Sequence, residues 1–234
     1  MHLISSCIIL FALLFSNTMH ADGLPLPYLV REPLVTSSQM PVLVLLHGLG
    51  SNEQDLFALA HRVPDRYLVV AVRAPIEVGA NQFAWYQVDF STGKPIYNRS
   101  QEQASRSTLL QFIEQLKLIY PNCGKVYFAG FSQGAIMSYS IGLTRPDLVQ
   151  GIAVLSGRLL EELKPSLRPN DSLRSLSIFI AHGTYDKVLD VSYARSSHAY
   201  LQSLSLQPRY KEYAAAHTLN EEMIKDLVQW LHER

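Results

Sequence analysis

The sequence is poor in cysteine and has no excess charge of either sign. Its 234 residues include only Cys7 and Cys123, and 20 lysines and arginines balance 20 aspartates and glutamates. Because Cys7 lies in an N-terminal segment that we expect to be removed, the rest of the chain has no pair of cysteines for an internal disulfide. Zero formal net charge and the lack of a basic stripe exclude the electrostatic footprint of a nucleic-acid-binding protein.

Internal repeats, low-complexity tracts and metal-ligand spacings are also missing. The potential ligands are dispersed along the chain, so we predict neither a metal site nor a cofactor. Hydrophobic residues make up 48% of the sequence, which suits one α/β domain with a substantial core. No shift in composition marks a second domain. We therefore expect residues 22–234 to form a single domain, with no nucleic-acid partner.

The apolar run near the N-terminus is too short to cross a membrane as a helix. It covers residues 8–15, and a mostly polar segment leads from it to Ala21. This length is typical of the core of a signal peptide. We expect residues 1–21 to be a signal peptide that exports the protein to the periplasm or out of the cell. The alternative is a misassigned start codon and a cytoplasmic protein, because Met1 and His2 supply no Lys or Arg.

The remaining sequence alternates buried strands with amphipathic helices. Strands are predicted at residues 41–46, 67–72, 126–131, 151–155, 176–181 and 209–213, and helices near residues 56–60, 101–120, 135–143, 192–204 and 220–232. This alternation indicates a mostly parallel sheet with helices on both faces. Residues 75–95 are expected to be loop, and residues 161–175 a surface excursion. In such sheets functional groups gather at the carboxyl ends of the strands.

The most informative motif is Gly-x-Ser-x-Gly at residues 130–134. An apolar strand leads into it and a helix-compatible run follows at once. This is the context of a nucleophile elbow, a tight turn that raises a serine hydroxyl above the edge of the sheet. The turn forces Ser132 into a sparsely allowed backbone conformation, so its neighbours two residues away must lack side chains. Gly130 and Gly134 meet that requirement.

Two further residues follow later strand ends, in the chain order of a Ser-Asp-His triad. Asp186 comes after the strand at residues 176–181, and His217 comes after the strand at 209–213. His217 is then the base that takes the proton of Ser132, while Asp186 orients the imidazole and stabilises its charged form. Asp190, four residues beyond Asp186, is the alternative acid.

An oxyanion hole requires two backbone N–H groups near the serine. Gln133 follows the nucleophile at the start of a helix, and Leu49 lies between glycines in the loop after the first predicted strand. We predict that these two amides form the hole. Trp85 and Phe131 are candidates to line the acyl-binding site, although an aromatic near a strand end is about as often plain core.

Six segments in chain order resemble the phospholipase/carboxylesterase family of small α/β-hydrolases, which includes the acyl-protein thioesterases. They are His47-Gly-Leu-Gly-Ser-Asn-Glu-Gln-Asp-Leu56, Arg73-Ala-Pro75, Ala84-Trp-Tyr86, Gly130-Phe-Ser-Gln-Gly134, Leu155-Ser-Gly157 and His182-Gly-Thr-Tyr-Asp186. The resemblance spans roughly residues 40–232. It implies an α/β-hydrolase fold with a small or absent lid.

The resemblance also implies hydrolysis of carboxylic esters or thioesters. Ser132, Asp186 and His217 match the family's triad positions, and Leu49 and Gln133 match its oxyanion donors. Two departures stand beside these matches. Ala216 occupies the place where the family commonly has glycine before the histidine, and Lys187 the place of proline after the acid.

We therefore expect a serine carboxylesterase that acts on small-molecule esters of small to medium acyl chains through an acyl-enzyme. The alternative within the family is a lysophospholipase or acyl-thioesterase with lipid-like substrates, for which transient contact with membrane lipid stays open. The alternative of another class is a non-catalytic binding module on a hydrolase fold. A dinucleotide-binding loop at residues 48–53 is disfavoured, because Glu53 stands where the third glycine of that motif belongs.

Overall fold

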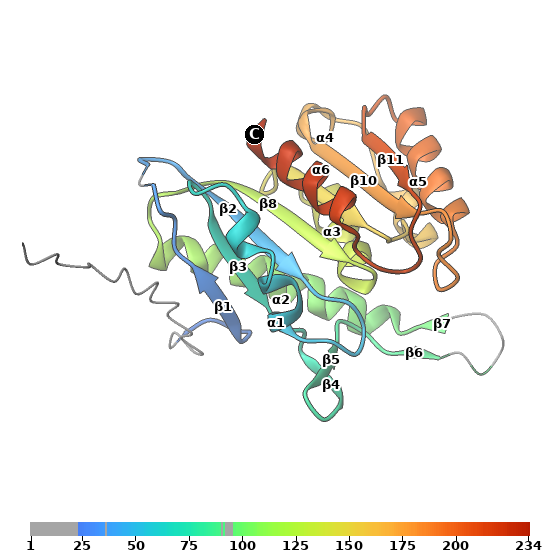
Figure 1. The fold of residues 1–234 in the computed structure, drawn as a ribbon, viewed down its shortest axis with the longest axis horizontal. Coiled ribbons are helices and arrows are strands. Elements are labelled where there is room, and N and C mark those ends of the chain that lie inside the picture. Colours follow the sequence, from blue (N-terminus) through green and yellow to red (C-terminus); the bar gives the residue numbers. More distant parts are fainter. Residues whose placement is uncertain (1–22, 36, 90, 92–95) are drawn as a thin grey trace, which may run out of the picture.

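The predicted strands lie side by side in one sheet of the computed structural model, which describes residues 23–35, 37–89, 91 and 96–234. Within these residues the sheet has seven strands (Figure 1), in the order β1 (Tyr28–Arg31), β3 (Leu68–Val72), β2 (Met40–Leu46), β8 (Cys123–Phe131), β9 (Gly151–Leu155), β10 (Ser177–Gly183) and β11 (Arg209–Tyr213). β1 runs antiparallel to β3, and the other neighbours pair in parallel. The predicted mostly parallel sheet is confirmed.

Helices cover both faces of this sheet, as the alternating pattern predicts. On one face lie α2 (Arg99–Ile119), α3 (Gln133–Thr144) and α5 (Val191–Ser203), whose apolar residues share a core cluster with Phe128. On the other face, the near one in Figure 1, lie α1 (Glu53–Phe57) and α6 (Glu221–His232), which share a second cluster with Tyr127. Successive residues of β8 thus serve opposite cores, since side chains alternate along a strand.

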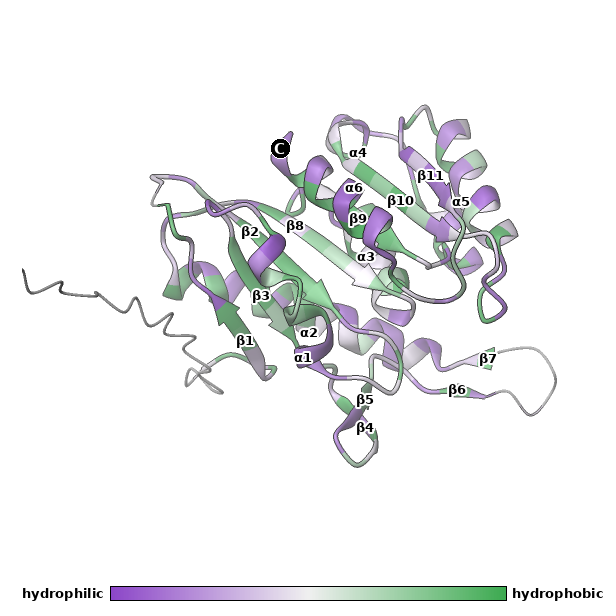
Figure 2. Ribbon diagram, in the orientation of Figure 1, coloured by the Kyte–Doolittle hydropathy of each residue, from purple (hydrophilic) through white to green (hydrophobic). Residues whose placement is uncertain are grey.

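Strands β2, β3 and β9 are apolar along their whole length because both of their faces are buried, whereas the edge strand β11 (Arg-Tyr-Lys-Glu-Tyr) is mostly polar. Figure 2 shows the central strands in hydrophobic colours and the helices with hydrophilic outer sides. In α6 the buried residues Met223, Leu227, Trp230 and Leu231 recur at helical spacing. Asn220 caps this helix by accepting a hydrogen bond from the N–H of Met223, at 2.8 Å.

Two segments contain more regular structure than the sequence predicts. Residues 75–95 were expected to be loop, but they carry the hairpin β4 (Ile76–Gly79) with β5 (Gln82–Ala84), and β6 (Val88–Asp89), which pairs with β7 (Ile96–Tyr97). The excursion at 161–175 contains the 3-10 helix η2 (Glu161–Ser166) and α4 (Asp171–Ser175). Such short elements show little periodicity, so their pattern is weak in the sequence.

β1 and the 3-10 helix η1 (Ala60–Arg62) were also not predicted, for the same reason. The expected signal peptide, residues 1–21, lies outside the described residues. Among the residues that the structure does describe, no helix has the length and apolar character needed to cross a membrane.

Candidate active site

Ser132 occupies the turn between β8 and α3 in a strained conformation, with φ 54° and ψ −114°. A non-glycine residue rarely takes a positive φ, and it persists only where the surrounding structure holds the backbone in place. A Cβ added to Gly130 would collide with the carbonyl of Gly134, and a Cβ on Gly134 would collide with the carbonyl of Leu46. The two glycines therefore let the turn pack tightly against its neighbours, as expected for a nucleophile elbow.

The structure brings Ser132, His217 and Asp186 into one hydrogen-bonded chain. The Oγ of Ser132 lies 2.8 Å from Nε2 of His217, and Nδ1 of His217 lies 2.6 Å from Oδ2 of Asp186. A carboxylate only accepts, so Nδ1–H of the ring donates to it and Nε2 is left to accept from the serine hydroxyl. The Asp186 side chain is 0% exposed and the His217 side chain 16%.

Backbone contacts join the loop that carries the acid to the loop that carries the histidine. The N–H of Thr184 donates to the carbonyl of Tyr213 at 2.8 Å, and the N–H of Tyr185 donates to that of Ala215 at 2.9 Å. Gly183 makes this approach possible, because a Cβ there would collide with the carbonyl of Ala215. The departures at Ala216 and Lys187 do not prevent this contact between the loops.

Asp186, and not Asp190, is the carboxylate that meets the histidine. Oδ1 of Asp186 accepts the N–H groups of Val188 and Leu189, at 2.9 and 2.8 Å, which leaves Oδ2 to face His217. Asp190 is exposed and caps α5, where its side chain accepts the N–H of Ser192 at 2.9 Å. The backbone of residues 186–189 therefore wraps around the acid.

The amides of Leu49 and Gln133 are both without an acceptor within the described part of the chain. The amide of Gln133 is at the first turn of α3, where no intrahelical partner exists. The Leu49 loop lies against the serine, since a Cβ on Gly48 would stand 3.4 Å from the Cβ of Ser132. Two unpartnered donors beside a serine hydroxyl are the groups that an oxyanion hole uses.

His47 braces the loop that carries Leu49. Its Nε2 accepts the N–H of Ala74 at 3.0 Å, and its Nδ1–H donates to the carbonyl of Gly48 at 2.7 Å. Burial lowers the pKa of His47 below its usual value, which keeps the ring neutral and able to accept.

Besides its backbone amide, Gln133 contributes side-chain hydrogen bonds that the sequence did not indicate. Its Oε1 accepts the N–H of Trp85 at 2.8 Å, and its Nε2–H donates to the carbonyl of Tyr86 at 2.7 Å. The indole N–H of Trp85 in turn donates to the carbonyl of His47 at 3.0 Å. These contacts tie α3 to the two loops beside it. They join backbone groups of distant segments, so no local pattern announces them.

The two aromatic candidates differ in position. Phe131 is half-buried, and its ring centroid lies 4.9 Å from that of His217, beside the hydrogen-bonded chain. Trp85 is 0% exposed. Trp85 therefore belongs to the core, which is the alternative that the sequence left open. Its predicted contact with substrate is not supported, because no part of the side chain is exposed.

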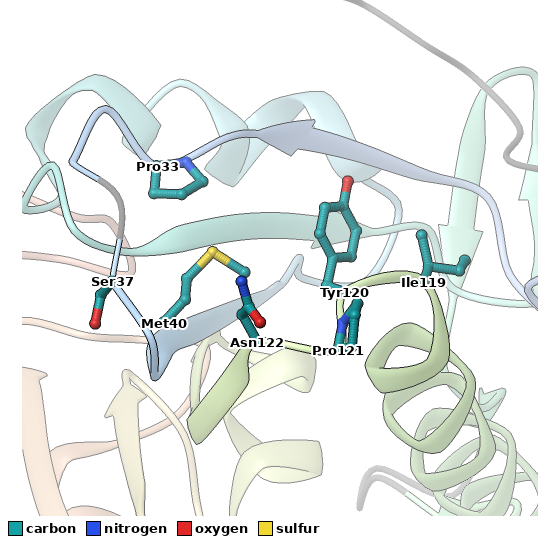
Figure 3. A pocket seen from close by; sticks show the side chains of 7 residues that line it. All are labelled: Pro33, Ser37, Met40, Ile119, Tyr120, Pro121 and Asn122. Carbon is teal, nitrogen blue, oxygen red and sulfur yellow. The ribbon is translucent and has the colours of Figure 1, made fainter.

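A hollow of about 670 Å³ lies beside the Leu49 loop, at the side where the two hairpins project. Its lining residues come from the Leu49 loop, β4 and the β6–β7 hairpin; they are Leu49, Val78, Gln87, Val88, Asp89, Ile96, Tyr97 and Asn98. A smaller hollow of about 190 Å³ lies at the amino ends of β2 and β8, near Met40 and Tyr120 (Figure 3). In the described residues, no three His, Cys, Asp or Glu side chains are grouped to hold a metal ion.

The sequence and the fold define the class of protein. A sequence model of the phospholipase/carboxylesterase family matches residues 34–233, and the chain therefore belongs to this family. It is 31% identical to acyl-protein thioesterase 1 of Mycosarcoma maydis, over 88% of this chain and 95% of that one. It is 28% identical to feruloyl esterase D of Neurospora crassa, over 76% of this chain and 59% of that one.

Solved structures carry the same fold. A carboxylesterase from Mesorhizobium loti superposes with a TM-score of 0.78 at 21% identity, covering 93% of this chain and all of its own. The expected α/β-hydrolase fold is confirmed.

Proposed function

We propose that this chain is a serine hydrolase that cleaves carboxylic esters of small to medium acyl chains. The observation that carries the proposal is the chain of hydrogen bonds from Ser132 through His217 to Asp186, at 2.8 and 2.6 Å. Membership of the phospholipase/carboxylesterase family supports an ester-cleaving or thioester-cleaving activity. In this proposal Ser132 is the nucleophile, His217 the base and Asp186 the acid of the triad.

The geometry supports a two-step reaction. His217 Nε2 takes the proton of Ser132 while Oγ attacks the carbonyl carbon of the ester. The charge that develops on the carbonyl oxygen is accepted by the N–H groups of Leu49 and Gln133. As the tetrahedral intermediate collapses, His217 gives its proton to the departing alkoxide or thiolate, which leaves the acyl group on Ser132. A water, deprotonated by the same imidazole, then attacks the acyl-enzyme and restores the serine.

The hollow beside Leu49 supports an acyl group bound next to the oxyanion donors. Leu49, Val78 and Ile96 are 43%, 42% and 55% exposed and present apolar surface there. An open hollow of this kind suits ligands that bury an apolar portion against protein. The ring of Phe131 packs against that of His217.

Lysophospholipid or acyl-thioester hydrolysis is the second candidate function. It is favoured by the 31% identity to an acyl-protein thioesterase. The chemistry is compatible, since a thiolate can leave from a tetrahedral intermediate in the same way as an alkoxide. The hollow does not discriminate between these leaving groups.

The first experiment is hydrolysis of p-nitrophenyl esters from acetyl to palmitoyl, together with acyl-thioester and lysophosphatidylcholine substrates. We expect activity that falls by a factor on the order of 10⁴ or more in Ser132→Ala, because the nucleophile is gone. The preferred acyl length and leaving group then decide between the two candidates. Activity that survives in Ser132→Ala would contradict the proposed nucleophile.

A non-catalytic binding module is the alternative of another class. A fluorophosphonate reacts covalently with an activated serine but not with an ordinary one, so it tests the site without knowledge of the substrate. We expect one label per chain, at Ser132, and no label in His217→Ala. A folded wild-type protein that stays unlabelled and hydrolyses none of the esters would establish the binding module instead.

We also propose that the chain consists of one catalytic domain preceded by an export signal. Residues 22–234 form the catalytic domain, and residues 1–21 form a signal peptide. Expression of the full chain with sequencing of the mature N-terminus tests this. A mature protein that begins near residue 22, recovered from the periplasm or medium, supports export, whereas an intact N-terminus on cytoplasmic protein supports the alternative.

A further inference from the structure

A second histidine touches the acid of the proposed triad. His182 lies near the end of β10 and is 0% exposed, and its Nε2 is 3.3 Å from Oδ2 of Asp186. Oδ2 is the same oxygen that accepts the N–H of His217. The carboxylate oxygen that orients the proposed base therefore stands between two imidazole rings, one on a central strand and one on a loop.

Hydrogen bonding assigns the tautomer of His182. Its Nε2 lies 2.7 Å from the carbonyl of Leu189, and a carbonyl only accepts, so Nε2 carries the proton. That N–H points at the carbonyl of Leu189, while Oδ2 of Asp186 lies 3.3 Å from Nε2 without receiving its hydrogen bond. The N–H of Leu189 closes the ring by donating to Oδ1 of the same carboxylate, at 2.8 Å. His182 thus fixes both the acid and the loop that wraps around it.

The other nitrogen of His182 indicates that packing alone does not account for this residue. Nδ1 is buried and has no hydrogen-bond partner in the described part of the chain. A buried polar atom without a partner is costly, and an apolar side chain of similar size would avoid that cost. An imidazole stands at this position although only one of its two nitrogens has a hydrogen-bond partner within the described residues.

We propose that His182 is a positioning residue: its Nε2–H holds the carbonyl of Leu189, and with it the loop whose N–H groups fix Oδ1 of Asp186, so that Oδ2 stays in line with Nδ1 of His217. This inference rests on the proposed serine hydrolase activity and adds a residue that supports the acid of the proposed triad. His182 does not contact Ser132, and it acts through Leu189 and Asp186. Second contacts of this kind orient a functional group, and misorientation lowers the rate of the chemical step.

Matched variants test the proposal. His182→Met keeps the volume without a donor, and His182→Gln places an amide N–H the same number of bonds from Cβ as Nε2. We expect kcat on p-nitrophenyl acetate to fall about tenfold or more in His182→Met, with KM within about twofold, and His182→Gln to recover most of the loss. A purely structural role predicts no such split between kcat and KM and no rescue by Gln.

A double-mutant cycle with Asp186→Asn separates action through the acid from a general effect. When Asp186→Asn is already present, His182→Met should cost less than about twofold, because the carboxylate that it orients is gone. Equal fold losses in both backgrounds would overturn the proposal, as would full activity of folded His182→Met. If His182→Met fails to fold, His182→Asn replaces it, because its shorter amide does not reach the position of Nε2.

Wild-type activity and fluorophosphonate labelling of Ser132 are measured in parallel. A folded wild-type protein that shows neither ester hydrolysis nor labelling of Ser132 would overturn the proposed function and this inference together. An active, labelled wild-type protein with an uncoupled cycle would overturn only the role of His182.

Discussion

At Ser132 the backbone and the chemistry make opposing demands. The proposed reaction requires a side chain that carries a hydroxyl, whereas φ of 54° with ψ of −114° is a conformation that suits glycine. The fold accepts this strain because glycines on both sides allow β8, α3 and β2 to approach closely. Strain of this kind costs on the order of 1–3 kcal/mol and concentrates at functional sites.

Removal of the strain should be measurable. We expect Ser132→Gly to be more stable than Ser132→Ala by about 1 kcal/mol, since strain relief outweighs the extra entropy of an unfolded glycine. Urea unfolding of the two inactive variants under the same conditions checks this. A Ser132→Ala protein that is the more stable of the two would show that the turn is not strained.

The acid assignment is tested by two neighbouring aspartates. Asp186→Asn should lower kcat by a factor on the order of 10⁴, because the amide holds the wrong tautomer of His217. Asp190→Asn should change neither activity nor stability appreciably, since asparagine caps a helix as well as aspartate does. Steady-state kinetics of the pair, made side by side, decide the matter. A larger loss in Asp190→Asn would overturn the assignment.

At the scale of elements, the hairpins β4–β5 and β6–β7 shape the hollow beside Leu49. Their apolar side chains Val78 and Ile96 are 42% and 55% exposed and line the hollow, so they are available to the proposed acyl substrate. Their strands are only two to four residues long, so strand pairing there depends on the rest of the fold. In the proposed function, the acyl site is therefore shaped by elements that the sequence predicts to be loop.

A charge in this hollow should discriminate between acyl lengths. We expect Ile96→Asp to lower kcat/KM for octanoyl esters about tenfold while acetyl ester hydrolysis stays within about twofold, because a carboxylate repels only acyl groups that reach it. Leu118→Asp is the matched control, since Leu118 is 81% exposed and lies near the end of α2. Parallel losses on both esters in Ile96→Asp would place the acyl group elsewhere.

An ion pair anchors the beginning of α1, which follows the Leu49 loop. Arg73 donates to both oxygens of Glu53, at 2.6 and 2.5 Å, and the Glu53 side chain is 1% exposed. Burial is the largest single influence on Glu53 and opposes its ionisation, but the hydrogen bonds from Arg73, a backbone hydrogen bond and the charges of Arg73 and His47 together hold its pKa below the ordinary value of 4.5. The pair joins the residue after β3 to the first turn of α1, which follows the loop that carries the proposed oxyanion donor.

This pair predicts a pH-dependent difference in stability. Because the folded pKa of Glu53 is depressed, its contribution is present above pH 4.5 and is lost as the pH falls through the lower folded pKa. We expect Glu53→Gln to cost about 2 kcal/mol at neutral pH. Urea unfolding of both proteins should show this difference shrinking below pH 4.5. A difference that grows on acidification would contradict the assigned direction.

At the scale of the whole molecule, the parallel sheet gathers groups that are distant in the chain. Ser132 and His217 meet across 85 residues, and His217 and Asp186 across 31. The helix that follows His217, α6, is held to the sheet by Trp230, whose ring lies 6.0 Å from that of Tyr127 and 6.1 Å from that of Phe179. These contacts anchor α6, the helix that follows the His217 loop, to β8 and β10.

Truncation of the Trp230 side chain tests how much this contact stabilises the fold and whether the chain unfolds as one domain. Trp230→Ala should destabilise the fold by about 3–5 kcal/mol through a cavity under α6, and unfolding should remain a single transition if residues 22–234 are one domain. Calorimetry together with circular dichroism checks both statements. Leu118→Ala, at an exposed position, is the control and should change stability by less than about 0.5 kcal/mol. Two separate transitions would contradict the single-domain prediction.

Several features follow from the sequence alone, because they depend on local pattern and chain order. The apolar runs at 41–46 and 67–72 indicate strands buried on two faces, and the glycines around Ser132 indicate the elbow. Parallel strands meet at one edge through their carboxyl ends, which is enough to predict that Asp186 and His217 approach the serine. The family follows from the same motifs, and residues 34–233 match it.

Contacts between segments without a local signature were decided only by the tertiary structure. The burial of Trp85, the bonds from the Gln133 side chain to residues 85 and 86, and the contact of His182 with Asp186 all join distant loops. The choice between Asp186 and Asp190 is of the same kind, because a carboxylate's direction depends on how its loop is wrapped. Local pattern places residues at a sheet edge, but only packing in three dimensions sets the angle and the partner of each side chain.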